Sequence, residues 1–136
     1  MKGNHINDLV KLSHSIGNHI SYAQGGGGNT SIKIDNNYML IKASGYKLSD
    51  MNINHGYCTV NYKDIVNIIN NEPQTNISES ELYENIKKSS LDDQTPSIET
   101  GFHSLLPFKC IAHSHSVYTN ILTCSMEGYE VSKKLK

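Results

Sequence analysis

The sequence contains no arginine, and charged residues of either sign are scarce. All 12 basic residues are lysines, and 13 acidic residues give a formal net charge of −1. General nucleic-acid binders normally carry a basic stripe, so this balance argues against a nucleic-acid partner. Hydrophobic residues make up only 37% of the chain, which is below the typical value for globular proteins. Asn (15 residues) and Ser (16 residues) are abundant instead, and both favour turns and helix caps.

Other absences concern membranes and export. No stretch reaches the uninterrupted apolar length of a membrane span, so we expect no membrane partner. Residues 1–5 are polar and lack the apolar region of a signal peptide. The three cysteines are an odd number without CxxC spacing, which indicates reduced thiols. Together these features predict a cytoplasmic protein.

A length of 136 residues suits one domain with a single core. Helical apolar spacing occupies four segments: residues 6–22, 78–86, 97–106 and 117–124. Alternating or short apolar runs predict four strands: residues 30–34, 38–42, 57–60 and 109–113. Residues 64–69 fit a helix or a strand equally well, and residues 70–76 fit a loop. This mixture predicts an α/β fold with a central sheet.

Local signals predict where these elements end and what they bury. Asn4 is a candidate cap for the first helix, and the glycine run at 25–28 is expected to end it. Ser78-x-x-Glu81 has the form of a capping box. In the third helix Ile98, Phe102, Leu105 and Leu106 share one apolar face. The strand at 109–113 is compact and is expected to be buried.

The strongest chemical signal is His113-Ser114-His115. Residues two apart on an extended strand point to the same face, so the two imidazoles project together. Two imidazoles on one face can bind a divalent metal, although two histidines can also alternate by chance in a chain that has seven. Glu99 is a candidate acid/base or metal ligand. His103 shares its helix face and is either its partner or a structural histidine.

A glycine run leads into the first predicted strand as Gly25-Gly26-Gly27-Gly28-Asn29-Thr30-Ser31. Consecutive N–H groups of such a run can form an anion-binding nest, to which the Asn29 amide and the Ser31 hydroxyl could add donors. The run is neither a P-loop nor a dinucleotide fingerprint, because Gly-Lys-Ser/Thr is absent and a helix precedes it. A ligand-binding loop is therefore favoured over a flexible linker.

Four motifs in this order resemble the class II aldolase/adducin superfamily. They are Gly28-Asn29-Thr30-Ser31, Lys42-Ala43-Ser44-Gly45, Pro96-Ser97-Ile98-Glu99 and His113-Ser114-His115-Ser116. The resemblance extends to about Cys124 and is greatest to fuculose-1-phosphate and rhamnulose-1-phosphate aldolases. It implies a three-layer α/β/α fold with a central mixed, largely antiparallel sheet. Residues 1–136 would form the N-terminal portion of such a domain, with its C-terminal part missing.

The resemblance also implies a chemistry. A divalent metal, with zinc as the first choice, would be bound by His113, His115 and Glu99. Glu99 would also act as the acid/base of a lyase that cleaves or epimerises a small ketose phosphate through a metal-stabilised enediolate. The substrate phosphate would be held by Asn29, Ser44, Gly45 and Ser97, with Gly28 and Ser31 in the same glycine loop. Family members are usually tetramers, so a homo-oligomer is expected.

Two departures from the family pattern leave an alternative open. No histidine follows His115, so the family's third metal-binding histidine is absent. Ile98 stands where the phosphate-binding aldolases often have a second serine. The alternative is a non-catalytic, adducin-like binding or assembly module that keeps the fold. A regulatory anion-binding domain is less favoured, because it leaves both histidines unexplained.

Overall fold

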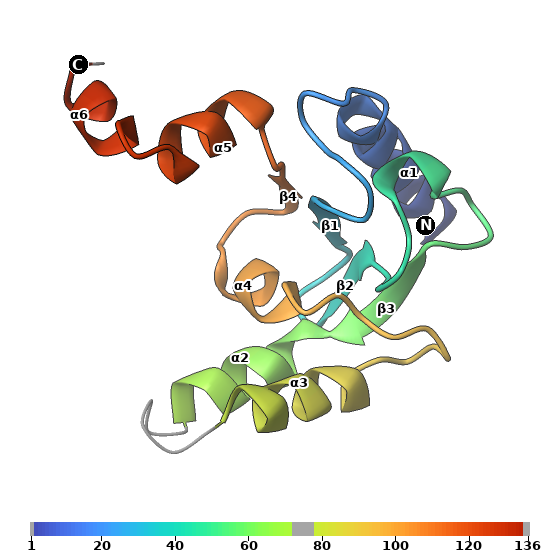
Figure 1. The fold of residues 1–136 in the computed structure, drawn as a ribbon. Helices are drawn as coiled ribbons and strands as arrows, with labels where there is room; N and C mark the ends of the chain where they lie inside the picture. Colours follow the sequence, from blue (N-terminus) through green and yellow to red (C-terminus); the bar gives the residue numbers. More distant parts are fainter. Residues whose placement is uncertain (1, 72–77, 135–136) are drawn as a thin grey trace.

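In a computed structural model that describes residues 2–71 and 78–134, four strands form one sheet (Figure 1). The strands are β1 (Asn29–Lys33), β2 (Tyr38–Lys42), β3 (Tyr57–Asn61) and β4 (Cys110–His113), in the order β3-β2-β1-β4. All three pairings are antiparallel. A turn joins β1 to β2, in which the Asp35 carboxylate accepts 2.8 Å hydrogen bonds from the backbone N–H groups of Asn37 and Tyr38.

Helices cover both faces of this sheet, which confirms the predicted three-layer α/β/α fold. One face carries α1 (Lys2–Gly17) and the 3-10 helix η1 (Leu48–Asp50), and the other carries α2 (Tyr62–Asn71), α3 (Glu79–Lys88) and α4 (Thr100–Leu105) (Figure 1). A buried cluster fills the first interface with Leu9, Ile32, Leu40 and Met51. A second contains Met39, Ile41, Cys58 and Val60. Strand β2 thus alternates its side chains between two cores.

The first helix begins and ends earlier than predicted. It spans Lys2–Gly17, so Asn4 lies inside it rather than at its cap, and the chain turns well before the glycine run. Gly17 packs on η1 so closely that a Cβ there would lie 2.5 Å from the Ser49 nitrogen and 2.6 Å from the Leu48 Cβ. Apolar spacing could not reveal this end, because the contact comes from a segment 31 residues further along the chain.

The ambiguous segment at 64–69 is helical. It belongs to α2, which continues to Asn71 into the predicted loop, while residues 72–77 lie outside the described residues. The capping box that opens α3 is confirmed. Ser78 Oγ accepts a 3.2 Å hydrogen bond from the Glu81 N–H, and the Glu81 carboxylate accepts a 2.9 Å bond from the Ser78 N–H.

The predicted apolar face of α4 was wrong. Ile98, Phe102 and Leu105 are 72%, 55% and 47% exposed, whereas the side chains turned inward are polar or small. The buried residues of this helix are Thr100, Gly101, His103 and Ser104. Hydrogen bonds of these polar groups, rather than apolar burial, therefore set the rotation of α4 on the sheet.

The predicted burial of the last strand was also wrong, because only Ile111 of β4 is buried. β4 forms the edge of the sheet and leads to α5 (Val117–Cys124) and α6 (Gly128–Lys133), which extend away from it (Figure 1). Helix α5 was predicted and is confirmed, but it buries none of its residues. Within the described ranges, no helix combines the length and apolarity needed to cross a membrane.

Replacement of Gly17 by alanine should destabilise the fold. Because the new Cβ would overlap backbone atoms of η1, we expect Gly17→Ala to lower the free energy of unfolding by about 1–3 kcal/mol. Gly3→Ala in the same helix is the control, because a Cβ there meets nothing within 4 Å, and it should be neutral or stabilising by up to about 1 kcal/mol. Urea denaturation measures both, and equal effects would contradict the packing described here.

Candidate active site

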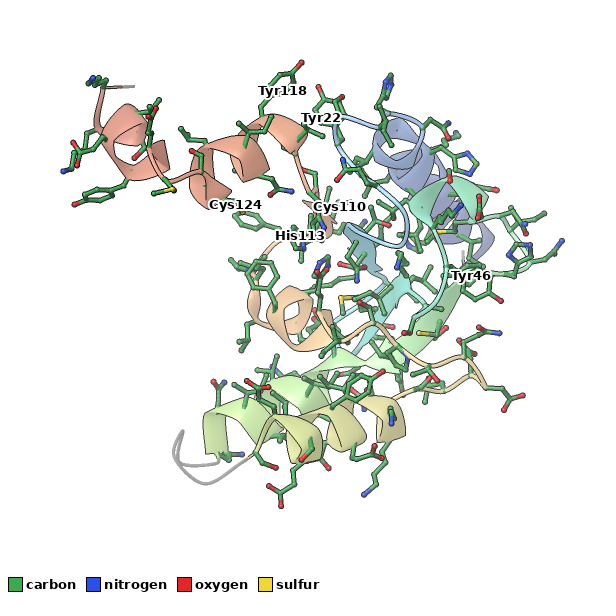
Figure 2. All side chains as sticks on the ribbon, in the orientation of Figure 1. Tyr22, Tyr46, Cys110, His113, Tyr118 and Cys124 are labelled. Carbon is green, nitrogen blue, oxygen red and sulfur yellow. The ribbon has the colours of Figure 1, made fainter. Side chains whose placement is uncertain are left out.

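Two histidines and one carboxylate meet where β4 ends. The Glu99 carboxylate spans both rings, with Oε2 2.9 Å from His113 Nδ1 and Oε1 4.0 Å from His115 Nε2. One ligand atom from each residue lies within 4.8 Å of the other two. The His113 side chain lies between β4 and α4 (Figure 2). The structure thus brings together the three residues that were predicted to be metal ligands, and all three are partly accessible.

Glu99 reaches the histidines because α4 is fastened to the polar face of β1. Ser31 Oγ and His103 Nδ1 lie 2.7 Å apart in a buried hydrogen bond. The Lys33 ammonium group donates to the backbone carbonyls of Ser104, at 3.2 Å, and Leu106, where α4 ends. These carbonyls have no partner within a helix that stops there. Two anchors on one strand therefore fix the helix whose N-cap residue is Glu99.

His103 is held in its neutral form by this environment. Burial lowers the pKa of His103 to about 4, although the nearby negative charge of Glu99 opposes the shift. Its side chain is fully buried, and its Nε2 atom has no hydrogen-bond partner. Of the two roles considered for His103, the structure supports a structural histidine, because its hydrogen bond joins α4 to Ser31 of β1.

Unpaired buried polar atoms gather at this one place. In the part of the chain that the structure describes, the buried side-chain N and O atoms without a hydrogen-bond partner belong to Asn29, Glu99, His103 and His113. Asn29 lies directly opposite His113 in the β1–β4 pairing, is fully buried, and leaves both amide atoms unsatisfied. His113 Nδ1 and Glu99 Oε2 are close, but not in hydrogen-bond geometry. Since each such atom costs about 1–3 kcal/mol, this cluster is suited to bind a ligand.

The predicted phosphate-binding turns lie beside Glu99. The Ser44 N–H donates to the Thr95 carbonyl at 2.8 Å, and the Ser97 N–H donates to the Lys42 carbonyl at 3.3 Å, so the two motifs run side by side. Ser44 is exposed, and Gly45 adopts a positive φ of 83° that favours glycine. Ser97 is buried, and its hydroxyl accepts a 3.4 Å bond from the Glu99 N–H.

The remaining predicted binding residues lie in the glycine loop and on β1. Gly28 is buried with φ of 78°, and a Cβ there would lie 3.0 Å from the His113 carbonyl oxygen. The Ser31 hydroxyl is already engaged by His103, which makes it an internal anchor in this structure. Gly28 and Asn29 therefore lie against the end of β4 that carries His113, whereas Ser31 holds α4 in place.

Sequence reasoning included Lys42 in a motif but gave it no role. This lysine ends β2 and is only 4% exposed. Burial lowers the pKa of Lys42, and the neighbouring Glu99 carboxylate raises it in turn, which shows that the two charges interact. The available signal was its position, since a charged residue that ends an otherwise apolar strand needs a partner when it is buried.

A separate groove of about 630 Å³ lies between α5 and α6. It is not the candidate active site. Its lining is mostly apolar, from residues such as Tyr118, Ile121 and Leu122, and includes none of the residues described above. Among the residues that the structure describes, those lining this groove form no metal-ligand cluster and have no unpaired buried polar side-chain atom.

The fold and site define an α/β/α domain with a Glu-His-His cluster at the edge of an antiparallel sheet. The chain belongs to the class II aldolase and adducin family, because the profile of the Class II Aldolase and Adducin N-terminal domain matches residues 7–134. A solved N-terminal class II aldolase domain of a conserved protein from Thermoplasma acidophilum is 25% identical, with a TM-score of 0.76. The match covers 89% of this chain and 59% of that chain.

Two further relatives agree. YgbL from Klebsiella pneumoniae shares the fold, with a TM-score of 0.62 at 20% identity over 90% of this chain and 49% of that chain. A Bacillus subtilis (strain 168) protein named uncharacterized oxidoreductase YuxG is 26% identical over 140 residues, which is 96% of this chain and 20% of that protein. The chain therefore spans between 20% and 59% of the length of these three relatives.

The buried state of His103 should make stability depend on pH. Because its folded pKa of about 4 lies below the unfolded value near 6.5, the unfolded state binds more protons between these values. The stability contribution is complete above about pH 6.5 and falls as the pH drops toward 4, by about 3 kcal/mol in total. Denaturation across this range should show the loss, and His103→Gln should reduce it.

The same prediction can be checked directly by following the histidine Cε1–H signals by NMR. His103 should titrate near pH 4, and its signal is assigned by its absence from the spectrum of His103→Gln. A His103 signal that titrates near pH 6.5 would contradict the buried, neutral ring.

Proposed function

We propose that the protein is a divalent-metal-dependent enzyme of the class II aldolase family that cleaves or epimerises a small ketose phosphate. The single observation that carries this proposal is the position of the Glu99–His113–His115 cluster beside the fully buried, unpaired amide of Asn29. A metal ligand set next to an unsatisfied amide can hold both a cation and the oxygen atoms of a polyol.

The three clustered residues fit a divalent metal in their chemistry. Two imidazoles and one carboxylate form a common ligand set for catalytic zinc, which keeps a further position open for water or substrate. Zinc is therefore our first choice of metal. When bound, the metal would act as a Lewis acid toward the substrate oxygens, which stabilises the negative charge left when a C–C bond breaks.

The remaining residues would bind the substrate and move protons. Glu99 would exchange a proton with a substrate hydroxyl. This role is supported by the position of its carboxylate beside His113 and by its partial exposure. Asn29 can both donate to and accept from the sugar oxygens. The phosphate would be bound by Ser44, Gly45 and Ser97 of the two adjacent turns and by Gly28 of the glycine loop. The charge of Lys42 would lie nearby.

The non-catalytic module is the less favoured alternative. A domain that serves only assembly has no need of a ligand cluster surrounded by unsatisfied buried atoms, which lower its stability. Among the relatives, the Thermoplasma domain carries the aldolase name in its description. A cytoplasmic location and a homo-oligomeric, tetramer-like assembly remain part of the proposal.

Metal binding is the first test. The purified protein should bind zinc, measured by competition with a chromogenic chelator, and the double variant His113→Ala/His115→Ala should bind it at least about 100-fold more weakly. His55→Ala is the matched control, because it removes an exposed histidine that is not part of the cluster. Unchanged zinc affinity in the double variant would exclude this site.

Turnover is the second test. Glu99→Gln keeps the shape of the side chain but removes its basicity, so cleavage of fuculose 1-phosphate or a related ketose phosphate should slow by at least about 100-fold in kcat. Glu79→Gln, an exposed carboxylate in the first turn of α3, should have no effect. A Glu99→Gln protein with wild-type kcat would remove the acid/base role. Absence of turnover in the zinc-loaded wild type would favour the binding module.

A further inference from the structure

We propose that Gly27 is a positioning residue for His115, so that part of the glycine loop serves the metal ligand rather than the phosphate. The inference rests on the proposed metal site. The His115 ring lies between two groups: a Cβ at Gly27 would be 2.7 Å from Nδ1 and 3.3 Å from Cε1, whereas Nε2 faces the Glu99 carboxylate at 4.0 Å. A side chain at position 27 would displace the ring.

The backbone of His115 is held independently of its ring. Its N–H donates a 2.8 Å hydrogen bond to the Tyr22 carbonyl, and the Val117 N–H donates a 2.9 Å bond to the Ser21 carbonyl. The turn before the glycine run therefore fixes the chain on both sides of Ser116. Since the backbone cannot shift easily, a contact at Gly27 acts on the ring's rotation and so on the direction of Nε2.

Conformation does not explain a glycine at this position. Gly25 and Gly28 adopt positive φ angles of 55° and 78°, which favour glycine, but Gly27 is outside that region. A Cβ at Gly26 would meet nothing within 4 Å. Position 27 is thus the one member of the run where the backbone accepts any residue and the close neighbour is a ligand ring. The other near atom, the Gln24 carbonyl oxygen at 3.0 Å, requires only a small adjustment.

The test compares two alanine variants of the same loop. Gly27→Ala should weaken the binding of zinc, and of cobalt as a spectroscopic probe, by about 10-fold or more, as expected when a ligand loses its orientation. The visible spectrum of the cobalt-loaded protein should change as well. Gly26→Ala, with open space around its new methyl group, should bind both metals like the wild type. Wild-type affinity and spectrum in Gly27→Ala would overturn the inference.

A double-mutant cycle shows whether the effect passes through His115. In a His115→Ala background, Gly27→Ala should cause no further loss of metal affinity, because the displaced ring is gone. An equal loss in both backgrounds would overturn the inference. Gly27→Ala should also retain the wild-type thermal midpoint, since the His115 ring is partly exposed and can turn without disturbing the core. A variant that unfolds would likewise overturn it.

The outcomes separate this inference from the proposed function. If neither His113→Ala nor His115→Ala changes metal affinity, the metal site itself fails and the role of Gly27 fails with it. If these variants lose metal while Gly27→Ala does not, the metal site stands and only the role of Gly27 is excluded.

Discussion

The attachment of α4 to the polar face of β1 is the interaction on which the candidate active site depends. Asn29, Ser31 and Lys33 alternate along one face of this central strand. The last two hold α4, one through His103 and the other through carbonyls at the helix end. Asn29 is left unpaired opposite His113. Strand β1 therefore determines the position of Glu99 through α4, and it also supplies the Asn29 amide next to the cluster.

This arrangement of α4 lowers the stability of the fold. An apolar α4 would dock on the sheet without unsatisfied atoms, but it would place no charged or polar group beside β4. Instead, the helix buries His103 as a neutral ring and leaves Ile98 and Phe102 in solvent. The unfavourable burial of polar groups is concentrated around Glu99, His113 and His115. Natural proteins tolerate such departures from favourable packing mainly at functional sites.

Local patterns predicted the parts of the molecule that depend on neighbours in sequence. The β1–β2 hairpin, the capping box of α3 and the paired imidazoles of His113, which ends β4, and His115 follow from spacing alone. The orientation of α4 could not be predicted in this way, because it depends on a hydrogen bond between Ser31 and His103, 72 residues apart. The proximity of Lys42 to Glu99 could not be predicted for a similar reason, since only the folded chain brings the two residues together.

The glycine loop was predicted to bind a ligand, and this prediction gives only part of its structural role. Its glycines predict that the backbone comes close to a ligand. In the structure the backbone comes close to His113 and His115 instead. Gly28 lies against the His113 carbonyl, and Gly27 lies against the ring of His115. A shift of this loop would also move the groups that contact His113 and His115. The proposed phosphate site and the proposed metal site would therefore be energetically coupled.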